Sequence, residues 1–235
     1  MDPSNAAFTL NPRARPSLLR PGTEGEPVVL VDDFFLTPER IVDFAVTDCV
    51  FGPGGAAYPG VRAAVPDILN HALIHALHPV IRQVFGVGDD TPLGLETSLA
   101  IVTDGPEGLR TPQRIPHYDV ADPRALAIVI YLCPPGWGGT AFFRHRSTGF
   151  ETVSPDRDET YNRRLARELA VMPLPEGFPD DRHPLFEQLV CVEPVFNRLV
   201  LYRSRILHSA TASARPFIAD PREGRLTITS FLRPA

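Results

Sequence analysis

The sequence predicts a mainly β protein with some helix, in which short strands form an antiparallel β-sandwich or jelly roll. From Leu93 onward, short β-branched segments are separated by Gly and Pro with few helical patterns between them, which is typical of antiparallel sheets. The 26 prolines are also scattered through turn-like clusters and not gathered into one tract. That distribution favours many strands joined by loops over a helical bundle.

The N-terminal third is expected to supply a helical layer. Residues 1–26 are rich in Pro, Arg and Gly and are expected to form an extended arm before a single domain at 27–235. Residues 28–35 predict a strand, and Thr37-Pro38 the N-cap and first residue of a helix. Residues 65–85 carry apolar side chains at helical spacing, which predicts an amphipathic helix against the sheet.

Five further segments are expected to be strands of the sandwich: LGLETSLAIVT (93–103), ALAIVIYLC (125–133), TAFF (140–143), NRLVLYRS (197–204) and RLTITSFL (225–232). One segment, 146–195, differs from these strands because its sequence is polar and has helical spacing. We interpret it as a helical insertion between core strands, acting either as a lid or as a subunit contact in a homodimer.

Composition narrows the function classes. A chain of 235 residues with 43% apolar residues can bury a full core. The net charge of −5 argues against a nucleic-acid partner, and no apolar run approaches the ~20 residues needed to span a membrane. No apolar stretch near the N-terminus suits a secretory signal. Three widely spaced cysteines suit reduced thiols, so we expect a cytoplasmic protein.

His117-Tyr118-Asp119 and the distant His208 form a candidate metal site. Residues i and i+2 of an extended segment project from one face, so His117 and Asp119 can bind one ion together. Two imidazoles and one carboxylate leave part of the coordination sphere open, as in non-haem iron oxygenases, although manganese, nickel and zinc accept the same ligands. The motif alone is weak, because chance gives roughly 0.5 His-x-Asp pairs in such a composition.

Arg225 adds a second observation. Strand alternation places Arg225, Thr227 and Thr229 on one face of the last strand, with Leu226, Ile228 and Ser230 on the other. An arginine on an inward face needs a counter-anion, because an unpaired buried charge is costly. A planar guanidinium binds a carboxylate through two parallel hydrogen bonds. Together with an open metal site, this arrangement implies a dicarboxylic co-substrate.

Five segments, in order, resemble the Fe(II)- and 2-oxoglutarate-dependent dioxygenases, and especially their prolyl-hydroxylase-like branch. These are VVLVDDFFLTPERIVDFA, HYD, IVIYLCPPGWGGTAFF, NRLVLYRSRILHS and RLTITSFL. The resemblance covers most of 28–233 apart from the insertion. It implies a double-stranded β-helix core, also called jelly-roll or cupin-like.

For individual residues, the resemblance implies that His117, Asp119 and His208 bind Fe(II) and that Arg225 binds the distal carboxylate of 2-oxoglutarate. Tyr131 matches a tyrosine that often helps to hold this carboxylate, and we add Thr227 to the co-substrate site because it shares the face of Arg225. Seventeen positions separate His208 from Arg225, more than is usual in the family. Arg215 is therefore a competing candidate, but it precedes Pro216 in a predicted loop.

The resemblance also implies the reaction, in which O2 and 2-oxoglutarate are converted to succinate and CO2 as a substrate is oxidised. The presence of Asp119 favours hydroxylation or demethylation over halogenation. The expected substrate is an amino acid, a peptide side chain or a natural-product intermediate. Two other classes stay open: a cupin-like metal protein that binds a small carboxylic acid without redox chemistry, and a non-catalytic interaction module built on 146–195.

Other histidines and aromatic residues have plainer interpretations. His71, His75 and His78 follow helical spacing but lack an acidic companion, so an ordinary helix face is expected. We expect His145 and His183 at the surface. Trp137 either contacts substrate or packs within its loop.

Overall fold

Two antiparallel sheets form the body of the protein in the computed structural model, which describes residues 8–55, 58–88 and 93–234. The eight-stranded sheet has the order β1 (Pro16–Leu19), β2 (Val28–Val31), β9 (Leu199–Arg203), β6 (Leu126–Tyr131), β11 (Arg225–Pro234), β5 (Leu93–Val102), β4 (Gly60–Ala64) and β3 (Gly52–Pro53). The three-stranded sheet has the order β10 (His208–Ala210), β7 (Thr140–His145) and β8 (Phe186–Val192). The mainly β, antiparallel class predicted from sequence is therefore confirmed.

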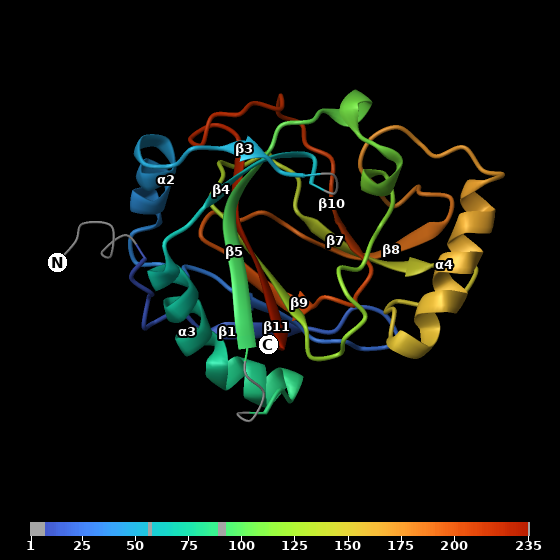
Figure 1. Ribbon diagram of the computed structural model, residues 1–235, viewed down its shortest axis with the longest axis horizontal. Helices are drawn as coiled ribbons and strands as arrows, with labels where there is room; N and C mark the ends of the chain where they lie inside the picture. Colours follow the sequence, from blue (N-terminus) through green and yellow to red (C-terminus); the bar gives the residue numbers. More distant parts are fainter. Residues whose placement is uncertain (1–7, 56–57, 89–92, 235) are drawn as a thin grey trace.

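Helices α2 (Pro38–Thr47) and α3 (Asp67–Phe85) lie beside the large sheet (Figure 1). Their apolar faces share one buried cluster with the large sheet, which includes Ile41, Leu73, Leu99, Leu226 and Ile228. Helix α2 begins after Thr37 with Pro38 in its first turn, as expected, although the Thr37 side chain makes no capping hydrogen bond. Within the described residues, no helix is both long and apolar enough to cross a bilayer.

Helix α4 (Pro155–Leu169) lies on the other side of the molecule, beside the small sheet (Figure 1). Its buried Tyr161 and Leu165 share a cluster with Phe143 and Phe186 of that sheet. A third cluster, which includes Tyr131, Phe142 and Tyr202, joins the facing sides of the two sheets. Alternation along β11 thus sends Leu226 and Ile228 toward α2 and α3, and Arg225 and Thr227 toward the small sheet.

The segment predicted to be a helical insertion, 146–195, is α-helical only in α4. Its later part forms β8, which pairs with β7 along Thr140–His145. The sequence FEQLVCV favours a strand, and without β8 the β7 strand would present an unpaired edge. The predicted arm is also attached: β1 pairs with β2, while residues 1–7 lie outside the described residues.

Candidate metal centre and its cavity

Backbone hydrogen bonds hold the His117-Tyr118-Asp119 segment against the chain that leads into β10. His117 N donates to His208 O at 2.9 Å, and His208 N donates to His117 O at 2.8 Å. Asp119 N donates to Ser204 O at 2.8 Å. Because the segment is bonded on both sides of Tyr118, the side chains of His117 and Asp119 leave it toward the same side, as the i, i+2 spacing predicts.

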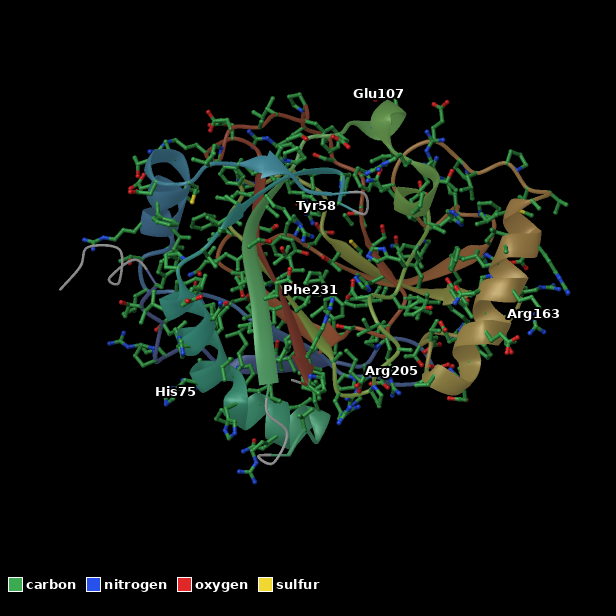
Figure 2. The ribbon with its side chains drawn as sticks, viewed as in Figure 1. Tyr58, His75, Glu107, Arg163, Arg205 and Phe231 are labelled. Atoms are coloured by element: carbon green, nitrogen blue, oxygen red, sulfur yellow. The ribbon has the colours of Figure 1, made fainter. Side chains whose placement is uncertain are left out.

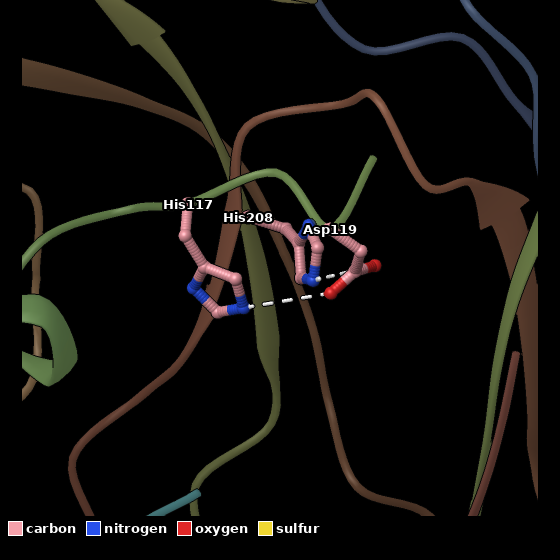
Figure 3. Close-up of side chains that lie close together, drawn as sticks. All are labelled: His117, Asp119 and His208. Carbon is pink, nitrogen blue, oxygen red and sulfur yellow. Dashed lines mark ion pairs between the residues drawn. The ribbon is translucent and has the colours of Figure 1, made fainter. Parts of the chain in front are cut away.

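The three side chains converge (Figure 3). His117 Nε2 lies 3.9 Å from Asp119 Oδ1, and His208 Nε2 lies 3.8 Å from Asp119 Oδ2. One nitrogen or oxygen atom from each residue lies within 4.8 Å of the others, and this is the one His/Cys/Asp/Glu group found in the described chain that could hold a metal ion. The three ligands predicted from sequence therefore meet at one point.

The hydrogen-bonding state of the triad suits a metal. His208 Nδ1 lies 2.8 Å from Ile206 O, so this nitrogen carries the proton and Nε2 keeps a lone pair facing Asp119. Asp119 Oδ2 is buried and has no hydrogen-bond partner among the described residues. A buried carboxylate oxygen without a donor is costly, and a bound cation would satisfy it. Two neutral imidazoles and a carboxylate are the donor set of non-haem Fe(II) sites.

The protein environment lowers the pKa of His117 and His208, which keeps both imidazoles neutral and able to bind a metal. Burial lowers the pKa of His117 and of His208 to about 4, and the neighbouring His208 contributes to the shift of His117. Both imidazoles are thus neutral near pH 7. Burial raises the pKa of Asp119, while His117, Arg233 and Arg62 oppose that rise. About 50% of the His117 side chain is exposed, and it borders the cavity described next.

A cavity of about 460 Å³ opens beside the triad, between the two sheets. This volume lies within the range of ~300–1,000 Å³ typical of small-molecule sites. One face of β11 lines the cavity along its whole length, through Arg225, Thr227, Thr229, Phe231 and Arg233. The inward face predicted for this strand is therefore confirmed, and it continues further than the prediction went.

Arg225 lies in this cavity with a buried guanidinium. Its Nε donates to Gly138 O at 2.7 Å and its Nη2 to Gly139 O at 3.0 Å. The residue is 6% exposed, and it forms no ion pair with any residue of the described chain. Arg215 lies elsewhere: it pairs with Glu223 and donates to Pro135 O, and it does not line the cavity. The structure thus brings Arg225, and not Arg215, to the metal triad.

Tyr131 and Thr227 surround Arg225. The guanidinium lies 5.6 Å from the centre of the Tyr131 ring, and Tyr131 Oη hydrogen bonds with Thr140 Oγ1 at 2.6 Å. Burial raises the Tyr131 pKa to about 12, so the hydroxyl keeps its proton. Thr227 and Thr140 line the cavity, whereas Tyr131 lies behind them. Tyr131 therefore contacts Arg225 and orients Thr140, and Thr227 presents the hydroxyl predicted for this face.

A model of one family, described as a family of unknown function (DUF6445), matches residues 12–232. The chain belongs to this family. No curated protein matches this DUF6445 chain. Among solved structures, it is similar to the non-heme alpha ketoglutarate dependent epimerase SnoN from nogalamycin biosynthesis, at 16% identity and a TM-score of 0.50, over 92% of this chain and 79% of that one.

A second solved structure is HygX from Streptomyces hygroscopicus with nickel, 2-oxoglutarate and hygromycin B bound. It is 13% identical, with a TM-score of 0.50, over 90% of this chain and 84% of that one. These likenesses show that this DUF6445 chain has the fold of 2-oxoglutarate-dependent non-haem iron enzymes, as the sequence resemblance implied. The prolyl-hydroxylase-like branch stays a prediction.

The sequence prediction did not single out several polar residues of the cavity wall of this DUF6445 protein, among them Tyr58, Arg62, Gln113 and Arg233. Tyr58 Oη, Arg62 Nε and Gln113 Nε2 are buried without a hydrogen-bond partner in the described chain. The alternation along β11 could have found Arg233, which shares the parity of Arg225. Tyr58 comes from a loop and Gln113 from a short 3-10 helix, Thr111–Gln113. Neither position carries a periodic signal, so the sequence alone could not place them.

The expectation that His145 and His183 lie at the surface is wrong. They are 0% and 2% exposed, respectively. His145 hydrogen bonds with Glu168 of α4 and with Thr148, and His183 packs against Phe186. These contacts bring α4 and the following loop onto the small sheet, and the position of histidines between layers cannot be predicted from local sequence. Trp137 is also buried, and it donates to Glu223 O and packs on Phe217.

Proposed function

We propose that this protein is an Fe(II)- and 2-oxoglutarate-dependent oxygenase that acts on a small organic molecule. The observation that supports it best is that one cavity contains both the His117/Asp119/His208 triad and the guanidinium of Arg225, which forms no ion pair in the described chain. A metal site alone would suit many proteins. A metal site beside a buried arginine without a counter-anion needs a ligand that carries a carboxylate and also reaches the metal.

Each side chain would have a defined part in this reaction. His117, Asp119 and His208 would hold Fe(II), which supplies the activation of O2 in the presence of a 2-oxo acid. Arg225 would bind the distal carboxylate of 2-oxoglutarate with its Nη1 group and with the Nη2 hydrogen that Gly139 O does not accept. The Thr227 hydroxyl, which donates a long hydrogen bond to Ala100 O at 3.4 Å, would rotate to donate to the same carboxylate. Arg225 itself is fixed by Gly138 O and Gly139 O, so little conformational entropy is lost on binding.

The proposed architecture is a double-stranded β-helix whose two halves are the large and the small sheet. The shared cluster between facing sides of the sheets supports this proposal. We further propose hydroxylation as the outcome, because Asp119 occupies a ligand position that a hydroxylase retains. A small-molecule substrate fits a cavity of about 460 Å³. Three cysteines without disulfides support a cytoplasmic location.

Succinate formation tests the function directly. Purified protein loaded anaerobically with Fe(II), then given 2-oxoglutarate and O2, should release succinate slowly even without the natural substrate. The matched control is Asp119→Ala, which removes one ligand and should abolish succinate release. Metal binding with neither succinate release nor metal-dependent 2-oxoglutarate binding would favour a non-redox, cupin-like metal protein instead.

A further inference from the structure

A second arginine lies at the Arg225 end of the cavity. Arg62 on β4 pairs in register with Ala100 on β5, and Ala100 pairs with Thr227 on β11. Paired residues of an antiparallel sheet project from the same face, so Arg62 and Thr227 both face the cavity that they line. Because the Ala100 side chain between them is small, the long side chain of Arg62 has room to lie across β5 toward β11.

Tyr58 connects Arg62 with the strand row that contains Arg225. The Tyr58 ring packs against the apolar cluster that contains Val102, and Val102 pairs in register with Arg225. The Arg62 guanidinium lies 4.5 Å from the centre of the Tyr58 ring. Burial raises the pKa of Tyr58, and the charges of Arg225 and Arg62 both oppose this rise. Tyr58, Arg62 and Arg225 therefore belong to one end of the cavity.

The segment that carries Tyr58 and Arg62 is attached to the large sheet. Thr103 N donates to Pro59 O at 3.1 Å, which fixes this segment to the end of β5. A Cβ at Gly54 would lie 2.7 Å from Tyr58 Cδ1, so a larger residue at this position would displace the Tyr58 ring. The sheet and this close approach thus hold the Tyr58 and Arg62 side chains in place before any ligand binds.

The polar groups of Arg62 and Tyr58 lack partners among the described residues. Arg62 forms no ion pair there, and its Nε and the Tyr58 Oη are buried without a hydrogen bond. Contact with an aromatic ring orients a guanidinium but leaves its charge uncompensated. Arg225 forms no ion pair either, and Asp119 of the triad is the one acidic residue among the described residues of the cavity wall. Two positive charges at one end of a cavity require an anion from outside the chain.

Arg62 and Arg225 are close enough to bind one carboxylate. Their Cα atoms are separated by two strand spacings across the sheet and two residues along it. This gives roughly 12 Å at ~4.8 Å per strand and ~3.4 Å per residue. Two arginine side chains that lean toward one another span such a distance. Thr227 lies on the strand between β5 and β6, so an anion bound at its hydroxyl would have Arg225 beside it and Arg62 on the β4 side.

We propose that Arg62 and Tyr58 complete the co-substrate site, so that the distal carboxylate of a 2-oxo diacid binds between two guanidinium groups. This proposal rests on the proposed oxygenase function and names the residues that select its co-substrate. Arg225 donates from one side, and Arg62 and the Tyr58 hydroxyl donate from the other. A 2-oxo monoacid leaves both positive charges uncompensated, so the second arginine makes the distal carboxylate a strict requirement.

Calorimetry of the Ni(II)-loaded protein with two matched ligands tests this proposal. 2-Oxoglutarate carries the distal carboxylate, whereas 2-oxopentanoate has a methyl group in its place and keeps the 2-oxo acid that binds a metal. In Arg62→Gln, the affinity for 2-oxoglutarate should fall roughly tenfold or more, because charge-assisted hydrogen bonds are lost. The affinity for 2-oxopentanoate should not fall, because this ligand offers no carboxylate to Arg62.

Two conservative variants separate a contact with the ligand from an effect on the fold. Tyr58→Phe removes only a hydroxyl group and should weaken 2-oxoglutarate binding roughly threefold to tenfold, with 2-oxopentanoate binding unchanged. Arg62→Lys keeps the charge and should retain part of the 2-oxoglutarate affinity. An unchanged 2-oxoglutarate affinity in Arg62→Gln overturns the proposal. An equal loss for both ligands also overturns it, because Arg62 would then act through the fold or the metal site.

The control variant is Arg163→Gln on the outer face of α4, at the edge of the molecule and away from the cavity (Figure 2). It removes one positive charge and should alter the affinity for neither ligand. The outcomes also distinguish the two proposals. If the wild-type protein binds Ni(II) and 2-oxoglutarate and Arg62→Gln binds them equally well, the oxygenase function stands and the role of Arg62 is wrong. If 2-oxoglutarate does not bind the wild-type protein, the oxygenase function is wrong.

Discussion

Arg225 and Arg233 lie on the same face of β11 and line the same cavity, one at each end of the strand. Arg225 is 6% exposed and is held by two carbonyl oxygens, whereas Arg233 is exposed and its guanidinium lies over the Phe231 ring. A buried guanidinium that is already fixed loses little conformational entropy when it binds an anion. The two ends of β11 therefore present a fixed, buried positive charge and an exposed positive charge to the same cavity.

Arg225→Gln should weaken 2-oxoglutarate binding. Removing one partner of a buried charged contact costs about 2–5 kcal/mol, so the dissociation constant should rise roughly 30-fold or more. Metal content should stay the same, because Arg225 does not touch the triad. Calorimetry of the Ni(II)-loaded protein measures both quantities. Arg215→Gln is the matched control, and an equal effect of the two variants would contradict our choice between these arginines.

Gly139→Ala should displace the Gly139 carbonyl, which holds the Arg225 guanidinium in place. A Cβ at Gly139 would lie 2.0 Å from Val192 O, and the Gly139 carbonyl accepts a hydrogen bond from Arg225. The chain must therefore shift, which costs about 1–3 kcal/mol of unfolding free energy and misplaces the guanidinium. Chemical denaturation and 2-oxoglutarate titration check the two effects. Gly52→Ala, where a Cβ meets nothing within 4 Å, should leave both unchanged.

The elements of the site that follow strand periodicity could be predicted from the sequence. His117 and Asp119 project together because of their i, i+2 spacing, and Arg225 and Thr227 share a face because strands alternate. The preference for Arg225 over Arg215 also followed from strand context. Each of these inferences needed only local geometry and one chemical argument about buried charge.

The remaining parts of the site depend on contacts between distant segments. Arg62 faces the cavity because β4 pairs with β5. The sequence around 60–64 contains no local pattern that predicts this pairing. The sequence predicts β8 as part of a helical insertion because the polar, helical pattern of α4 lies in the same segment, 146–195. The burial of His145 depends on Glu168, 23 residues away on α4. Such positions are set by tertiary packing, which a periodic pattern does not encode.

Asp119→Asn should make the metal-free protein more stable while it reduces metal binding. Burial raises the pKa of Asp119, and its Oδ2 has no hydrogen-bond partner in the described chain, so the carboxylate destabilises the fold without metal. We expect a gain of about 1–3 kcal/mol in metal-free unfolding free energy and a loss of at least about tenfold in Fe(II) affinity. Denaturant titration and metal analysis measure these.

The exposed Asp181→Asn is the control for the Asp119 variant and should change unfolding free energy by less than about 0.5 kcal/mol. A metal-free Asp119→Asn protein that is less stable than wild type would contradict the idea that the carboxylate is retained for metal binding at a cost to the fold.

Glu151 should make the attachment of the N-terminal segment sensitive to acid. Burial tends to raise the pKa of Glu151, but hydrogen bonds from Thr23 N, Glu24 N and the Arg144 guanidinium outweigh burial and lower it below 4.5. A carboxyl group whose pKa is lower in the folded state than in the unfolded state stabilises the fold above the unfolded value. That stabilisation is lost as the pH falls from about 4.5 through the folded pKa.

Glu151→Gln should therefore reduce unfolding free energy by roughly 2–3 kcal/mol at pH 7, because hydrogen bonds to a charged group are lost. The difference from wild type should shrink as the pH falls from about 4.5 through the lower folded pKa, below which the wild-type carboxyl group is also neutral. Denaturant titrations from pH 3 to pH 7 measure this difference. Glu187→Gln, which removes the more exposed partner of Arg144, should cost much less. A difference independent of pH would show that the contacts of Glu151 matter through shape and not through charge.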